Sequence, residues 1–124
     1  MTRAHREACL LIADDDPVFR ETVIEIVEPY FETIAVPSGE HAIQVVESKL
    51  VDLALFDMSM HVLSGLDVIR WMRARQLALP CILMSGDVTQ ELEQQALELE
   101  TFSVLRKPPG REQLLDTIHC ALEL

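Results

Sequence analysis

Short runs of apolar residues alternate along the chain with longer segments in which apolar residues recur at helical spacing. Continuous apolar character predicts strands at residues 9–13, 32–36, 53–56, 81–84 and 102–105. Apolar residues at every third or fourth position predict helices at residues 17–28, 38–49, 66–75, 89–100 and 110–122. No linker, repeat or low-complexity segment interrupts this alternation.

The alternation predicts the α/β fold class. Strands that are apolar throughout are typical of a parallel sheet that is covered by helices on both faces. Because the connections between parallel strands are right-handed, the helices must divide between the two faces, which gives a doubly wound sheet. We therefore predict a single domain over residues 1–124, with its core from about residue 8 to residue 122.

Composition narrows the function classes. The chain has 124 residues, with 10 Lys and Arg against 21 Asp and Glu, so its net charge is −11. Such an acidic chain would be repelled by a phosphate backbone, which argues against direct nucleic-acid binding. No apolar run is long enough to span a membrane. Three widely spaced cysteines suit reduced thiols in the cytoplasm better than a disulfide framework.

Polar residues with chemical potential follow four of the five predicted strands. They are the acidic run at 14–16, Asp57, Ser85 and Lys107. The carboxyl ends of parallel strands share one edge of the sheet, so these side chains should converge there. Clustered carboxylates cannot all stay ionised without a cation, and oxygen ligands favour Mg²⁺. A carboxylate beside Mg²⁺ can attack a phosphoryl group, whose oxygens Lys107 and Ser85 would then bind.

Each of these residues also has a simpler local interpretation. Asp16 is expected to cap the helix that begins at Pro17. Ser85, which precedes Gly86, could be a turn hydroxyl, and Lys107 could be a solvated lysine. These local roles do not explain why all the polar residues fall at the same edge of the sheet.

Five segments resemble the receiver domain of bacterial two-component response regulators. They are LLIADDDP at 10–17, DLALFDMSM at 52–60, SGLD at 64–67, ILMSG at 82–86 and LRKP at 105–108. Each segment alone is a weak signal, but their order and spacing together are specific, and the similarity runs from about residue 8 to residue 122. The resemblance implies a flavodoxin-like, five-stranded parallel sheet in the order 2-1-3-4-5.

The resemblance also implies a role for each matching residue. Asp57 corresponds to the phosphoacceptor. Asp14 and Asp15 correspond to the acidic pair that holds Mg²⁺, and Ser59 corresponds to a residue whose backbone carbonyl binds the metal. Ser85 corresponds to the switch hydroxyl, and Lys107 corresponds to the lysine that pairs with the phosphoryl group. A cis Lys107–Pro108 peptide bond is implied as well.

The function that follows from the resemblance is regulatory. Asp57 would accept a phosphoryl group from a histidine kinase or a histidine phosphotransfer protein, and the domain would switch between inactive and active conformations. It would signal to a downstream output domain or protein, and a phosphorylation-dependent homodimer is allowed. Such a domain is no enzyme beyond its own phosphorylation and dephosphorylation. Whether it stands alone or belongs to a longer regulator or hybrid kinase is left open.

Three features of the sequence depart from the family pattern. His61 replaces the usual proline after the phosphoacceptor, and we expect it to be a surface loop residue. Val104 stands where a Tyr or Phe commonly reports activation, so we expect the signal to leave through the 86–90 loop instead. Glu100-Thr101 replaces the usual Gly-Ala before the last strand.

Two other classes of function remain as alternatives. An aspartate-nucleophile phosphohydrolase would use Asp14 and Asp16 as its first motif, but it would leave Asp57 without a role. A pseudo-receiver that docks a partner without phosphorylation would be expected to lack part of the site, and none of the matching residues is missing here.

Overall fold

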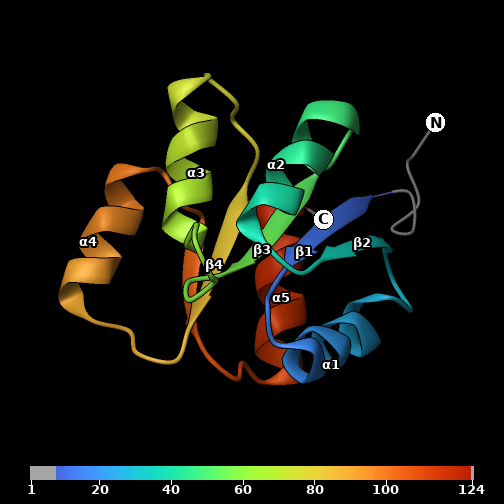
Figure 1. Cartoon of the computed structure of the whole chain (residues 1–124). Coiled ribbons are helices and arrows are strands. Elements are labelled where there is room, and N and C mark those ends of the chain that lie inside the picture. The colour runs from blue at the N-terminus through green and yellow to red at the C-terminus, as the bar shows by residue number, and fades with distance from the viewer. Residues whose placement is uncertain (1–7, 124) are drawn as a thin grey trace.

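The computed structural model describes residues 8–123 and consists of one parallel sheet between two layers of helices (Figure 1). The five strands lie in the order β2-β1-β3-β4-β5, which confirms the predicted fold class and strand order. Along the chain the elements are β1 (Cys9–Ala13), α1 (Pro17–Val27), β2 (Glu32–Val36), α2 (Gly39–Ser48), β3 (Leu53–Asp57), α3 (Gly65–Ala74), β4 (Cys81–Ser85), α4 (Gln90–Glu98), β5 (Ser103–Arg106) and α5 (Arg111–Leu122).

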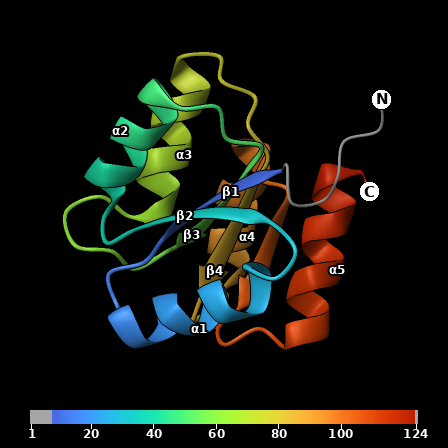
Figure 2. The same cartoon turned by 90° about the vertical axis from the view of Figure 1, so that its right-hand side faces the viewer.

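The helices divide between the two faces of the sheet. Helices α1 and α5 pack on one face, and α2, α3 and α4 pack on the other (Figure 2). Strands β1, β3 and β4 are buried along their whole length because both of their faces are covered. This explains why their sequences are continuously apolar rather than alternating.

Short polar residues fix where several helices begin. The Asp16 carboxylate accepts hydrogen bonds from the backbone N–H groups of Val18 and Phe19, and Ser38 caps α2 by accepting from the N–H of His41. The Asp16 cap confirms the sequence interpretation, and α2 begins beside residue 38, where the sequence predicted a helix to start. Ser64 and Asp67 form a reciprocal capping box at the start of α3. These caps set the direction in which each helix leaves the edge of the sheet.

The structure differs from the prediction mainly at element ends. Phe102 precedes β5 and is 47% exposed, although the apolar run predicted it inside the strand. Thr89 and Gly110 are N-cap residues rather than helical residues. Phe102 still donates its backbone N–H to the Cys81 carbonyl, so the chain pairs one residue before the strand proper. In the described part of the chain, no helix has the length and apolar character needed to cross a membrane.

Candidate functional site

Three carboxylates meet at the carboxyl edge of the sheet. Strands β1 and β3 are neighbours with Ala13 opposite Phe56, so Asp14 and Asp57 leave the sheet side by side. Both are almost fully buried, whereas Asp15 is exposed at the rim. One carboxylate oxygen from each of the three aspartates lies within 4.8 Å of the other two. The predicted convergence of the acidic residues is therefore confirmed.

Lys107 completes this cluster from the far side of β4. Its Nζ lies 3.0 Å from Asp14 Oδ2 and 3.3 Å from Asp57 Oδ1. The backbone N–H of Lys107 donates to the Ser85 carbonyl, which fixes the chain as it leaves β5. The Lys107–Pro108 peptide bond is cis, as the resemblance implied.

The end of β3 is tightly packed against the start of α3. A Cβ atom on Gly65 would lie 2.7 Å from the backbone oxygen of Asp57 and 2.5 Å from Leu83 Cδ1. Only glycine permits α3 to start this close to Asp57 without displacing it. This close packing explains the glycine of the SGLD segment.

The Ser85 hydroxyl lies at the end of β4 and is buried. It donates to the Asp87 carbonyl at 3.0 Å and accepts from the Asp87 N–H at 3.2 Å. The structure therefore places Ser85 at the predicted edge, and its hydroxyl has the turn contacts that the local interpretation expected.

The geometry agrees with comparisons against known proteins. A family model described as the response regulator receiver domain matches residues 10–119. The chain belongs to this family.

Related proteins agree with the family match. The chain is 31% identical over 115 residues to Regulatory protein VirG of Rhizobium rhizogenes, covering 91% of this chain and 47% of that protein. It is 30% identical over 114 residues to Heme response regulator HssR of Staphylococcus saprophyticus, covering 91% and 50%. The chain thus spans about half the length of these relatives.

Solved structures share the fold. A CheY-like receiver domain protein from Methanospirillum hungatei superimposes with a TM-score of 0.88 at 21% identity, covering 94% of both chains. The receiver domain of the putative response regulator NarL from Mycobacterium tuberculosis gives 0.86 at 24% identity, covering 94% of this chain and 97% of that one. These likenesses establish the architecture of the receiver domain.

The charges of this receiver domain are unbalanced around Asp57. Burial and the neighbouring Asp14 charge raise the pKa of Asp57, while Lys107 and the Ser59 N–H partly offset this rise. Burial alone would lower the pKa of Lys107, but its contacts with Asp14 and Asp57 leave that pKa above its ordinary value. Lys107 is therefore a permanent cation beside a carboxylate whose ionised form is disfavoured.

The donor set fits a hard divalent cation. The three aspartates offer only oxygen, and the described residues bring no His or Cys into their cluster. Asp14 Oδ2 is buried and makes no hydrogen bond beyond its ion pair with Lys107. Exposed Asp15 leaves the rim open to water, which Mg²⁺ retains in protein sites. The Ser59 N–H donates to Asp57 Oδ1 at 3.3 Å, and the metal role of its carbonyl stays a prediction.

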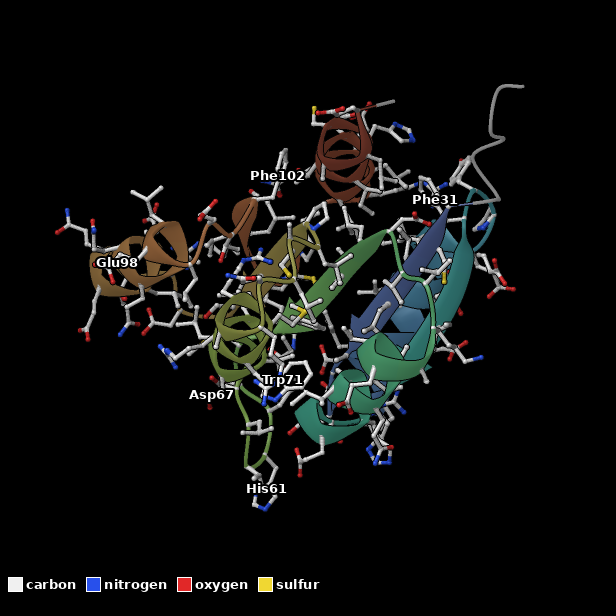
Figure 3. All side chains as sticks on the ribbon, turned by 90° about the horizontal axis from the view of Figure 1, so that it is seen from above. Phe31, His61, Asp67, Trp71, Glu98 and Phe102 are labelled. Carbon is white, nitrogen blue, oxygen red and sulfur yellow. The ribbon has the colours of Figure 1, made fainter. Side chains whose placement is uncertain are left out.

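His61 is exposed at the tip of the β3–α3 loop and points away from the sheet (Figure 3). Its backbone N–H, not its ring, contacts the site by donating to Asp15 Oδ2 at 3.3 Å. The expected surface position of His61 is confirmed.

Two residues at the site were not identified from the sequence. Arg20 Nη1 donates to the Asp14 carbonyl at 2.7 Å, and the Lys107 Nζ lies 4.1 Å from the centre of the Phe19 ring. Both are on the first turns of α1, directly after the acidic run, and that proximity was a usable signal for Arg20. The apolar periodicity of residues 17–28 includes Phe19, but periodicity does not say which distant side chain a ring will contact.

Proposed function

We propose that this receiver domain accepts a phosphoryl group on Asp57 from a phosphohistidine. The observation that carries the proposal is the position of the Lys107 ammonium, which contacts both Asp14 and Asp57. A cation held at the rim of an acidic pocket can pair with phosphoryl oxygens as they arrive. The match to the receiver family supports the same assignment.

In this reaction an oxygen of ionised Asp57 attacks phosphorus. The new O–P bond forms as the N–P bond to the donor histidine breaks, and the electron pair returns to the imidazole ring. Lys107 partly offsets the effect of burial on the Asp57 carboxylate and then faces the added phosphoryl charge, which is about −2. The domain thereby acts as a regulatory acceptor rather than a turnover enzyme.

The acidic pocket also supports a role for Mg²⁺ in this reaction. When bound, Mg²⁺ supplies the positive charge that three carboxylates and a phosphoryl group together require. The residues that would hold it are Asp14, Asp15, Asp57 and the backbone carbonyl of Ser59.

The partners in this proposal follow from the chemistry and the family. The phosphodonor is a histidine kinase or a histidine phosphotransfer protein, and the receiver controls an output domain or protein in the cytoplasm. Relatives that carry the names regulatory protein and response regulator support this role. The phosphohydrolase alternative is weakened because the Asp16 carboxylate caps α1, so Asp14 and Asp16 do not act as a pair.

The signal would leave the site through the loop at residues 86–90. Phosphoryl binding by the Ser85 hydroxyl would break its two contacts with Asp87 and release the loop that leads into α4. Half-buried Val104 has no ring to turn into the vacated space. We therefore expect the response on the face made by α4, β5 and α5.

Incubation with acetyl phosphate and Mg²⁺ followed by intact-mass measurement tests phosphorylation. We expect one phosphoryl group on the wild type, none on Asp57→Asn, and none when EDTA removes Mg²⁺. The matched control is Asp116→Asn, an exposed aspartate on α5 that should be phosphorylated normally. An unmodified wild type, or a modified Asp57→Asn variant, would refute the proposal, and the unmodified wild type would favour a docking pseudo-receiver.

Amide NMR with Mg²⁺ and beryllofluoride, a phosphoryl mimic, tests the route of the signal. We expect shifts that extend from Asp57 through residues 86–105. Shifts confined to the immediate surroundings of Asp57, or a response that requires Val104→Tyr, would contradict the route through the loop.

A further inference from the structure

Lys107 has a third neighbour besides its two carboxylates. The ammonium lies over the ring of Phe19, with Nζ 4.1 Å from the ring centre. Asp14 Oδ2 and Asp57 Oδ1 are its other neighbours, at 3.0 and 3.3 Å. The Lys107 side chain is only 18% exposed, so little of it faces water.

The start of α1 determines where the Phe19 ring lies. Asp16 accepts from the N–H groups of Val18 and Phe19, and Pro17 occupies the first helical position. This cap starts the helix directly beneath the acidic run, and Phe19 packs partly into the core between the sheet, α1 and α5. The ring is therefore anchored on rigid structure rather than on a loop.

An aromatic ring suits this position for an electrostatic reason. Its face attracts a cation, yet it offers no oxygen that would compete with Asp57 or with an incoming phosphoryl group. A lysine side chain is flexible and its ammonium can rotate between acceptors. A ring face restrains the ammonium near the pocket while leaving it free to turn from Asp57 to a phosphoryl oxygen.

We propose that Phe19 is a positioning residue, which holds the Lys107 ammonium at Asp57 by presenting its ring face to the side of the ammonium that the carboxylates leave open. The functional consequence rests on the proposed phosphorylation of Asp57, whereas the placement of Lys107 can be measured without it. Phe19 itself touches neither the phosphoryl group nor the metal in this proposal.

Selective ¹³C labelling of lysine provides the first test, because Lys49 and Lys107 are the only two lysines in the chain. In the unphosphorylated wild type we expect the Lys107 Hε signals to be shifted upfield by the ring, and the Cε relaxation to show restricted motion. Exposed Lys49 is the internal reference. Phe19→Leu should remove the shift and increase the mobility of Lys107 above that in the wild type, while Phe19→Tyr, which retains a ring, should keep both features.

The second test is the rate of phosphorylation by acetyl phosphate at saturating Mg²⁺. A contact of this kind corresponds to a loss of roughly two- to fivefold in rate for Phe19→Leu, with recovery in Phe19→Tyr. Ile24→Val is the packing control, since Ile24 lies on the same helix, more than one turn after Phe19, and packs on the same core. It should phosphorylate as the wild type does.

The outcomes separate the two proposals. An unchanged Lys107 signal and mobility in Phe19→Leu overturns the positioning role. So does an unchanged phosphorylation rate, or an equal loss in Ile24→Val, which would show that Phe19 acts only through packing. If the wild type is not phosphorylated at all, the proposed function fails, and the lysine signals still decide whether Phe19 holds Lys107 in place.

Discussion

Two cationic side chains stabilise opposite edges of the sheet, and their partners are of different kinds. At the carboxyl edge, Lys107 lies against the carboxylates of Asp14 and Asp57. At the amino edge, where β4 and β5 begin, Arg73 uses its guanidinium to bind backbone oxygen atoms. These belong to Leu77, Leu79, Leu99 and Glu100.

The difference separates the proposed phosphoacceptor site from a structural contact. The carbonyls around Arg73 are neutral, so nothing there gains from a change in charge. Even Cys81, beside Arg73, is not activated, because burial outweighs the cation and raises the pKa of its thiol to about 12. At the carboxyl edge, three carboxylates face one ammonium, and this imbalance is what a divalent cation or a change at Asp57 would alter.

Removing Arg73 should give the largest change in stability. Arg73→Met leaves four carbonyls of two connections without their shared donor, and we expect the free energy of unfolding to fall by about 3 kcal/mol. Arg73→Lys should recover only part of this, because an ammonium cannot reach all four carbonyls in one geometry. Urea denaturation measures both variants.

The comparison also requires that the folded Arg73→Met protein keep its chemistry. Its phosphorylation by acetyl phosphate should match that of the wild type under conditions where both are folded. If Arg73→Met lost less than about 0.5 kcal/mol of stability, or lost phosphorylation specifically, the amino edge would not have the purely structural role that the comparison gives it.

Asp57→Asn should have the opposite effect on stability. Burial and Asp14 raise the pKa of Asp57 above its ordinary value of 3.8, so the folded state binds the proton more tightly than the unfolded chain. Stability is therefore lost as pH rises from 3.8 through the folded pKa, and the full cost is present at neutral pH. Without divalent cations, Asp57→Asn should therefore raise the free energy of unfolding at pH 7.

The pH dependence shows whether the stability gained in Asp57→Asn comes from removing the ionisable carboxyl group. The gain should shrink as the pH falls through the folded pKa toward 3.8, because below 3.8 the wild-type carboxyl is protonated in both states. Exposed Asp116→Asn should show no comparable gain at pH 7. If Asp57→Asn were destabilising at neutral pH without metal, the ionised carboxylate would be well satisfied and the proposed imbalance would be wrong.

The sequence predicted the fold well because the decisive signals are local and periodic. Fully buried strands such as β1 and β3 read as uninterrupted apolar runs, and Asp16 and Ser38 marked helix starts. Phe102 was placed in a strand because its apolar character says nothing about exposure at a strand end. The end residues of β1, β3, β4 and β5 could be brought together only because parallel strands share an edge.

Contacts between side chains from distant elements could not be predicted in the same way. The position of Phe19 under Lys107 depends on the helix cap and the path after β5, and neither is visible in a hydrophobic pattern. The sequence placed Arg73 only within the helix predicted at residues 66–75. Its role depends on where two separate connections place their carbonyls, which is a property of the assembled fold.

The smallest expected effect concerns backbone strain at the two edges. Val62, beside the site, and Glu100, held by Arg73, both have left-handed backbone conformations, with φ of 70° and 54°. A β-branched side chain is least compatible with this region, so Val62→Gly should raise the free energy of unfolding by about 1 kcal/mol. Glu100→Gly should gain about half as much, because glycine also increases the entropy of the unfolded chain and an unbranched residue relieves less strain.

Val62→Ala, which retains a Cβ atom, is the control and should gain less than Val62→Gly in the same urea titration. Equal gains at Val62 and Glu100 would contradict the argument, since Val62 is 70% exposed and has little packing that could offset its conformation.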